Sequence, residues 1–458
     1  MLRVAAAALL LALAACTPFA SRTPPSEAAR TALPPIEQEW AMARGEVGSV
    51  QPGWIAAIND PLLLRLVEEA QENNRDLRQV AAGVAQARAI VGQRGAALWP
   101  ALNYSGSTTD AGLLEGSSSD SYSAGLLLNW ELDLWGRLRA NRRSAFLSAE
   151  SAYVDYVFSQ YTLAATVAQT YFQLIEAGLQ EEVARKSFSV LAETERIVSA
   201  QRKLGAVSAL DVALADRDLA NAADAVASAE GNRRRAVRAL EVLLGRYPRA
   251  AVAASTNLPL VPELPPPGLP AELLTRRPDI VAAELALAAR FKDVEAAKAS
   301  RLPTLSLTGS LTGSSPELSE VLESDTAAWQ LASNLLGPLF DAGLRGAQID
   351  QAQAAQLQQL EGYAQTVLTA FQEVENSLDQ STILKRRETA LTAAATAANR
   401  ALELARLRYQ EGETDLLDVL TIQTTTFNAD SALVNVQRLR LDEWIRLNLA
   451  LGGNWAAP

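Results

Sequence analysis

The sequence predicts a mainly α-helical chain in which a long helical hairpin, joined to a pair of β-strands, occurs twice in tandem. Two observations support this fold class. First, "KLGAVSALDV" at 203–212 aligns without a gap with "QEGETDLLDV" at 410–419, so a shift of 207 residues carries Gly205 onto Gly412. Second, long stretches of heptad-spaced apolar residues alternate with short stretches in which apolar and polar residues strictly alternate. Heptad spacing is typical of packed helices, and strict alternation is typical of half-buried strands.

The duplication also sets the expected domain boundaries. The shift of 207 carries Gly136 onto Gly343, whereas further upstream a shift of 203 carries Pro100 onto Pro303. The segment between the copies contains "LPLVPELPPPGLP", and proline at that density excludes a helix or a central strand. We therefore expect, in chain order, a signal peptide at 1–15, an extended and lipidated N-terminal segment at 16–60, a first repeat at 61–246, an extended connector at 247–276, a second repeat at 277–453 and a tail at 454–458.

Two apolar seams run along the first long helix. One seam, from Val154 to Ile175, alternates spacings of three and four, and the other, from Phe158 to Leu179, recurs every seven residues. Two seams indicate neighbours on both sides, as in a ring of helices, although one seam of an ordinary bundle remains an alternative. The segment 156–175 carries no charge. Its glutamines and its heptad pattern nevertheless favour a packed helix over a membrane span.

The alternating stretches predict four strands, each with one apolar and one polar face. Such strands fit either a half-buried sheet or a membrane barrel that is apolar toward lipid and polar toward water. Four strands cannot close a barrel, because about eight are needed, and open edges are not tolerated in lipid. Either the sheet packs on a soluble element or several chains pool their strands. The strands are expected at about 100–109, 121–133, 303–313 and 326–336, with polar loops at 110–120 and 313–325.

The composition excludes several classes of function. The net charge is −11, and an acidic chain without a basic block is a poor partner for nucleic acid. The chain has no histidine and a single cysteine, so it lacks the usual general base and the usual soft metal ligands. No nucleophile elbow, glycine-rich phosphate loop or CxxC motif is present. We expect no catalytic residue, no metal site, no cofactor and no nucleic-acid partner.

The N-terminus predicts secretion. In "MLRVAAAALLLALAACT" one basic residue, Arg3, precedes an apolar run that ends in Leu-Ala-Ala-Cys16. The sequence around Cys16 resembles a bacterial lipoprotein signal, which implies that Cys16 becomes the lipidated first residue. An ordinary signal with an incidental cysteine is the alternative. Thr17 stands where an aspartate, by the same resemblance, would favour retention at the inner membrane.

Five stretches resemble the outer-membrane efflux protein family, the TolC-like channels, and most of all the NodT-like lipoprotein branch found in multidrug efflux systems. The resemblance covers nearly all of the mature chain, and these stretches, which lie in its second half, occur in the expected order. They are "RRPDIVAAE" (276–284), "RLPTLSLTGS" (301–310), "GPLFDAGLRGA" (337–347), "AFQEVENSL" (370–378) and "RYQEGETDLLDVL" (408–420).

The resemblance implies a homotrimer whose twelve strands form one β-barrel in the outer membrane and whose helices form an α-barrel through the periplasm. It implies a non-enzymatic exit duct for small molecules such as drugs, joined by a periplasmic adaptor to a proton-driven inner-membrane pump. Polypeptide export with an ATP-driven pump is an alternative within the same family. A periplasmic adaptor or a coiled-coil spacer is an alternative of another class, although adaptors carry one hairpin and a spacer needs no strands.

The duplicated motif at 203–212 and 410–419 is expected to form two helix–turn–helix tips at the end of the tunnel away from the membrane. Gly205 and Gly412 suit the left-handed residue that ends a helix. The resemblance makes these tips the surface that contacts the adaptor. The expected contact residues are Gly205, Ser208, Gly412, Thr414 and Asp415.

Four side chains at the tips are expected to start the following helices. Ser208 and Asp415 stand at N-cap positions, and Asp211 and Asp418, three residues on, complete an approximate capping box. A purely structural role for the two aspartates is therefore one interpretation. It does not exclude a role at an opening.

The resemblance also implies that Asp211, Tyr409 and Asp418 hold the periplasmic entrance shut. Thr414 stands where an arginine pairs across the entrance in one version of this closure, and Thr421 stands where a second aspartate does. The resemblance therefore does not establish that ion pairs contribute to the closure in this chain. A ring of carboxylates from several chains would favour cations, divalent ions most of all.

Overall fold

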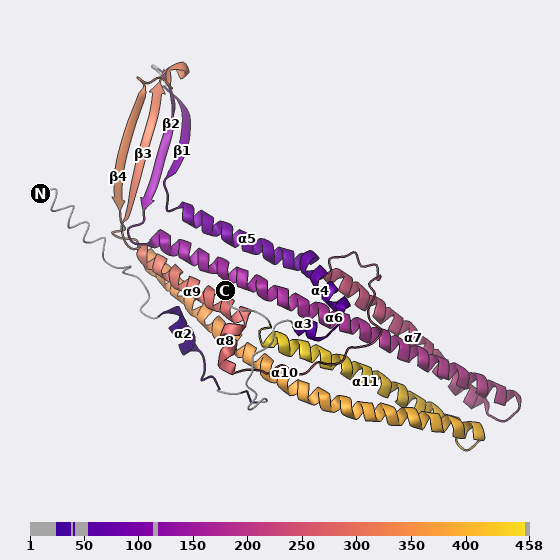
Figure 1. Ribbon diagram of the computed structural model, residues 1–458. Helices are drawn as coiled ribbons and strands as arrows, with labels where there is room; N and C mark the ends of the chain where they lie inside the picture. Colours follow the sequence, from indigo (N-terminus) through magenta and orange to yellow (C-terminus); the bar gives the residue numbers. More distant parts are fainter. Residues whose placement is uncertain (1–23, 38–39, 42–53, 113–117, 454–458) are drawn as a thin grey trace. The chain divides into compact units, whose positions relative to one another are not determined.

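The computed structural model describes residues 24–37, 40–41, 54–112 and 118–453. Figure 1 shows the series of helix, strand pair, long helix and shorter helix twice along the chain. The first copy consists of α5 (Arg75–Ala96), β1 (Ala101–Gly112), β2 (Ser118–Leu132), α6 (Arg137–Lys203) and α7 (Ala209–Leu243), preceded by α4 (Pro61–Asn73). The second consists of α9 (Pro278–Ala299), β3 (Thr304–Ser315), β4 (Ala327–Leu336), α10 (Leu344–Glu411) and α11 (Leu416–Ala450).

The strands are longer than the sequence predicts. β1 continues past residue 109 to Gly112 and β2 already begins at Ser118, with Asp110 paired to Asp120, so most of the loop expected at 110–120 is strand. In the second copy β3 reaches Ser315, and the short 3-10 helix η2 (Leu318–Glu320) follows. The sequence misplaces these ends because the ladder is made by backbone groups, so the strands continue past the last alternating apolar residue.

Two segments expected to be extended contain short helices. Within the described part of 16–60 lie α2 (Pro25–Ala32) and α3 (Trp54–Ala57). The connector is irregular up to Leu269 and then forms η1 (Pro270–Glu272) and α8 (Leu273–Arg276). A proline is tolerated in the first turn of a helix, where its missing N–H has no partner to lose. Proline content alone therefore overestimated the extended structure.

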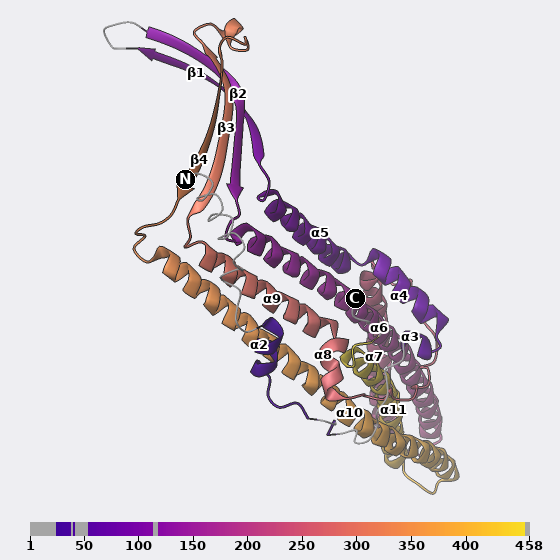
Figure 2. The same ribbon diagram turned by 60° about the vertical axis from the view of Figure 1, so that its left-hand side comes forward.

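The chain divides into two compact units, of which the first contains residues 24–34, 81–155 and 279–366 as far as they are described. Its four strands form one antiparallel sheet in the order β1-β2-β3-β4 (Figure 2). The register aligns apolar residues in rows across all four strands, and Tyr104 and Trp329 in one row are 91% and 79% exposed. One face of the sheet is thus apolar and uncovered, which marks it for contact with an apolar phase. Its rows are Tyr104–Leu126–Leu311–Trp329 and Leu102–Leu128–Gly309–Leu331, and the opposite face holds the row Asn103–Leu127–Ser310–Gln330.

The second unit contains residues 35–80, 156–278 and 367–458 as far as they are described, and its core surrounds the middle of α6. Both predicted seams contribute buried residues here. Leu441, Trp444 and Ile445 of α11 belong to the same core as residues of α4, α6 and α7, so the last helix of the second repeat packs within the first. The buried seam residues of α6 are Ala164, Ala168, Tyr171 and Ile175 of one line and Ala165 and Phe172 of the other.

A buried hydrogen-bond network ties the connector to this core. The hydroxyl of the fully buried Tyr171 donates to Asp60 Oδ2 over 2.8 Å and lies 2.8 Å from Ser255 Oγ. Asp60 Oδ1 in turn accepts the Leu62 N–H and so caps α4. Among the described residues, no helix combines the length and apolar character needed to cross a bilayer.

Candidate functional site

The two helix–turn–helix tips lie in the second unit, where α6 meets α7 and α10 meets α11 (Figure 1). Gly205 and Gly412 have φ angles of 74° and 77°, in the left-handed region where glycine is favoured. In the first turn the Ala206 N–H donates to the Gln201 carbonyl over 2.9 Å, and the second turn makes the equivalent bond over 2.9 Å. Both long helices therefore end in a Schellman motif, and the expectation that Gly205 and Gly412 are left-handed is confirmed.

The first tip starts its second helix with a complete capping box. Ser208 Oγ accepts the Asp211 N–H over 3.2 Å, and Asp211 Oδ2 accepts the Ser208 N–H over 2.8 Å. These hydrogen bonds from the Ser208 side chain and backbone hold the pKa of Asp211 below its usual value. The predicted cap is confirmed in the first copy.

The second tip does not repeat this cap. Asp415 occupies the N-cap position of α11, but its side chain makes no capping hydrogen bond. Asp418 Oδ2 instead accepts the Thr414 hydroxyl over 3.0 Å. A capping box between two aspartates would bring two carboxylates together, and their repulsion opposes it. The prediction of a second capping box was wrong.

Tyr409 joins the two hairpins of the protomer. Its hydroxyl donates to Gln201 Oε1 over 2.9 Å, from α10 to α6. Burial and, to a smaller extent, the nearby carboxylate of Asp211 raise the pKa of Tyr409. The ring packs against an apolar cluster, named here the tip core, which consists of Leu191, Val198, Ala215, Ala222, Leu416 and Leu420.

The three entrance candidates therefore fall into two groups. Asp211 and Tyr409 lie close enough to interact electrostatically. Asp418 lines a separate hollow of about 400 Å³ on the second hairpin, together with Arg408, Thr414 and Thr421. Each carboxylate is held by a hydroxyl, so neither needs an arginine in the same chain to be satisfied.

Gln201 and the tip core were not predicted from the sequence. A usable signal was present, because Leu191, Thr194, Val198 and Gln201 again alternate spacings of three and four, although this line is out of register with the two seams nearer the middle of the helix. Leu191, Thr194 and Val198 are buried. A further line of α6 residues therefore leads to the turn, and its last position, Gln201, accepts the hydrogen bond from the Tyr409 hydroxyl.

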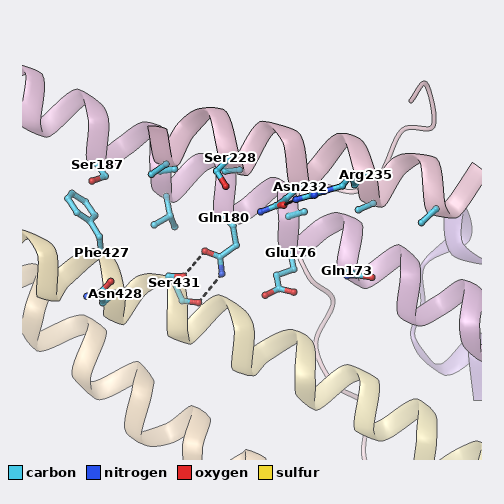
Figure 3. A pocket seen from close by; sticks show the side chains of 17 residues that line it. Gln173, Glu176, Gln180, Ser187, Ser228, Asn232, Arg235, Phe427, Asn428 and Ser431 are labelled. Carbon is cyan, nitrogen blue, oxygen red and sulfur yellow. Dashed lines mark hydrogen bonds between the residues drawn. The ribbon is translucent and has the colours of Figure 1, made fainter. Parts of the chain in front are cut away.

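A second hollow in this unit is a groove of about 750 Å³ lined by α6, α7 and α11 (Figure 3). Gln180 Nε2 donates to the Ser431 carbonyl over 3.0 Å, and the Ser431 hydroxyl donates to Gln180 Oε1 over 2.8 Å. This reciprocal pair ties α6 to α11 along the groove. The labelled polar lining is Gln173, Glu176, Gln180, Ser187, Ser228, Asn232, Arg235, Asn428 and Ser431.

Among the described residues, no three histidine, cysteine, aspartate or glutamate side chains are grouped so that they could hold a metal ion. Cys16, the predicted lipid attachment residue, lies outside the described residues, as do the signal peptide and the tail at 454–458. Paired hairpins, exposed turns and an uncovered apolar sheet face are features of a surface that assembles with other molecules.

The comparison with protein families settles the class. The model that describes the outer membrane efflux proteins matches residues 66–246 and 269–453. The chain belongs to the outer membrane efflux protein family. The resemblance read from the sequence motifs is thereby confirmed, and this efflux protein is an outer-membrane channel.

Three relatives illustrate how far the similarity extends. The pyoverdine export outer membrane protein OpmQ of Pseudomonas aeruginosa is 33% identical over 91% of this chain and 90% of its own length. The probable outer membrane lipoprotein SilC of Salmonella typhimurium is 30% identical over 92% of this chain and 93% of its own. The crystal structure of the Campylobacter jejuni CmeC outer membrane channel superposes with a TM-score of 0.87 at 25% identity, covering 92% of this efflux protein and 93% of CmeC.

Proposed function

We propose that this efflux channel is the non-enzymatic exit duct of a tripartite system, and that it passes small molecules such as drugs from an inner-membrane pump to the outside. The main observation that supports an assembled duct is the sheet, which presents one apolar face and leaves β1 and β4 as open edges. Three chains would pool twelve strands and close one barrel, whereas four strands cannot. The name of OpmQ, which refers to pyoverdine export, supports a small-molecule cargo.

The proposed anchor is a lipid on Cys16 after removal of residues 1–15. The small residues before Cys16 support this assignment, and so does the name of SilC as a probable lipoprotein. The bilayer is thus a partner through both the acyl chains and the sheet. Mass spectrometry of the mature N-terminus tests the anchor, and an unmodified Cys16 would contradict it.

The proposed periplasmic entrance is formed by the tips, with Asp211, Tyr409 and Asp418 as the residues that narrow it. Three chains would place six carboxylates around the opening, and such a ring attracts divalent cations. We expect Asp418→Ala to raise single-channel conductance or to remove block by divalent ions. Asp224→Ala, which removes an exposed carboxylate from the middle of α7, is the matched control and should leave both unchanged. Wild-type currents in Asp418→Ala would exclude this role.

The tips are also proposed as the docking surface for a periplasmic adaptor, with Gly205, Ser208, Gly412, Thr414 and Asp415 exposed or half-buried there. Gly412→Trp should abolish efflux while oligomers still form, because the indole blocks the surface. Gly412→Ala is the control, since it introduces the same backbone strain without the bulk. Drug resistance at the wild-type level in Gly412→Trp, with normal expression, would refute docking at this turn.

The class of pump is tested by cross-linking intact cells, purifying the tagged channel and identifying its partners by mass spectrometry. Recovery of an adaptor with a large proton-driven transporter supports small-molecule efflux. Recovery of an ATP-driven transporter instead would overturn the cargo assignment in favour of polypeptide export.

A further inference from the structure

The two ends of the sheet differ in charge. No lysine or arginine occurs between Pro100 and Gly136 or between Leu302 and Leu344. The ends of the two strand pairs that lie away from the helices carry only acidic charge. The acidic residues of those strand ends and of the described turn are Asp110, Asp120, Glu317, Glu320, Glu323 and Asp325.

At the opposite end of the sheet, cations gather where the strands join α5, α6, α9 and α10. We call this set the basic collar. All its members lie in the first unit and within about two helical turns of a strand–helix junction. It consists of Arg94, Arg137, Arg139, Arg142, Arg143, Lys298, Arg301 and Arg345.

Three members of the basic collar are neutralised within the chain. Arg137 pairs with Glu131 over 2.7 Å, Arg139 pairs with Asp133 over 3.0 Å, and Arg345 pairs with Asp341. Within the part of the chain that the structure describes, the other five have no acidic partner. The unpaired members are Arg94, Arg142, Arg143, Lys298 and Arg301.

Packing brings the unpaired cations close to the junctions. A Cβ atom at Gly95 would lie 3.5 Å from Arg142 Nε, so Arg142 reaches from α6 to the end of α5, next to Arg94. The Arg143 guanidinium lies 4.9 Å from the centre of the Phe146 ring. In the second repeat, a Cβ atom at Gly346 would lie 3.8 Å from an Arg301 guanidinium nitrogen.

The cations at the starts of the two long helices do not stabilise those helices. Neither α6 nor α10 has an acidic residue in its first turn, and Arg137, Arg139 and Arg345 occupy those turns instead. Positive charge at a helix N-terminus opposes the helix dipole. Asp133 and Asp341 offset this by accepting backbone N–H groups of the first turns. The excess of cations therefore indicates an anionic partner outside the chain.

Exposed apolar and aromatic side chains lie beside the basic collar. Trp99 precedes β1 and is 74% exposed, and Phe340 lies between β4 and α10 and is 90% exposed. Leu339 and Trp135 are also exposed at these junctions. Aromatic residues are enriched where a membrane protein passes from hydrocarbon to headgroups. The cations thus lie at the depth where lipid phosphates would be found.

We propose that the basic collar binds the phosphate groups of anionic phospholipids in the leaflet that faces the helices. This inference rests on the proposed insertion of the sheet in the outer membrane and is independent of cargo, pump and adaptor. Arg142 and Arg143 are the principal candidates, because both are exposed, adjacent and without an acidic partner among the described residues. A guanidinium presents a fork of donors that matches phosphate oxygens.

The test uses the full-length channel reconstituted in vesicles of equal parts phosphatidylglycerol and phosphatidylcholine, followed by native mass spectrometry of the lipids that remain bound. The wild type should retain phosphatidylglycerol in preference to phosphatidylcholine. Removal of one surface cation weakens attraction to an anionic headgroup about fivefold, so Arg142→Gln with Arg143→Gln should lower the preference about 25-fold. Raising the salt concentration should lower the wild-type preference in the same direction.

Matched variants test whether the lipid preference depends on the basic collar or on the positive charge of the protein in general. Arg386→Gln with Arg387→Gln removes an adjacent exposed arginine pair from the middle of α10 and should leave the preference unchanged. Arg142→Lys with Arg143→Lys keeps the charge and should retain most of it. An equal loss in the Arg386/Arg387 variant, or an unchanged preference in the Arg142/Arg143 variant, would overturn the proposal.

Two further outcomes are distinguishable. If inorganic phosphate at matched ionic strength displaces the bound phosphatidylglycerol, the collar is a site for free anions and the lipid assignment is wrong. If the wild type does not insert into vesicles at all, the proposed function fails. Insertion without lipid preference defeats only the inference on the basic collar.

Discussion

The two tips of the protomer end their long helices in the same way but begin the next helices differently. Both turns place a glycine in the left-handed region and close the same backbone hydrogen bond. After the turn, Ser208 and Asp211 form a capping box, whereas Asp415 caps nothing and Asp418 is bound by Thr414. The backbone requirement of the turn is met identically in both copies. The side chains that follow differ, and in the second copy they leave Asp415 without a structural task.

The largest effect is expected from the tip core that both tips share. Leu420 is 3% exposed, and Leu420→Ala should lower the local free energy of unfolding by about 3 kcal/mol, through lost burial and the cavity left behind. Because the core joins both hairpins, protease cleavage should increase at both turns. Leu417→Ala, at a side chain that is 59% exposed on the same helix, should change little. Cleavage confined to one turn would show that the tips do not share a core.

The next largest loss of stability is expected from substitutions of the turn glycines. Gly205→Ala and Gly412→Ala should each cost about 1–2 kcal/mol of local stability, because a Cβ atom is disfavoured at positive φ. The two costs should be equal, since a Cβ atom at either position meets no atom within 4 Å. Hydrogen exchange of the Ala206 and Glu413 amides measures them. Unequal protection in the two variants would contradict the equivalence of the turns.

The helix starts should then separate the two copies. Ser208→Ala should cost about 1 kcal/mol, the usual effect of losing an N-cap. Asp415→Ala should be close to neutral, because the Asp415 side chain makes no capping hydrogen bond. Amide exchange in the first turns of α7 and α11 gives both values. A cost for Asp415→Ala as large as that for Ser208→Ala would mean that the second tip is capped after all.

The smallest effect is a dependence on acid. The Ser208 hydrogen bonds lower the pKa of Asp211 below its usual 3.8. Its stabilising contribution is therefore complete above that value, and it is lost as the pH falls through the lower pKa of the folded state. Exchange at the first turn of α7 should accelerate below about pH 4. Asp211→Asn should remove this part of the pH dependence, and an unchanged profile in that variant would assign it to another group.

The sequence predicts what is periodic and fails where a partner is distant in the chain. The heptad lines of α6 and the alternating strands were readable because burial repeats at a fixed spacing. The row Tyr104–Leu126–Leu311–Trp329 could not be predicted, since β2 and β3 belong to different repeats and nothing local fixes their register. The contact of Tyr409 with Gln201 is equally non-local. The second cap failed for another reason, because two carboxylates fit the motif by spacing but not by charge.

The core around α6 has a consequence for how the chain is made. Leu441, Trp444 and Ile445 of α11 lie in the same core as Trp54 near the N-terminus, and the Tyr171 hydroxyl is fully satisfied only when Ser255 of the connector is in place. The two halves of the duplication are therefore not two folding units. A chain that has been synthesised only as far as residue 246 lacks both Ser255, a hydrogen-bond partner of Tyr171, and α11, the last helix of this core. The contacts of this core with α11 can therefore form only after the last helix of the chain has been made.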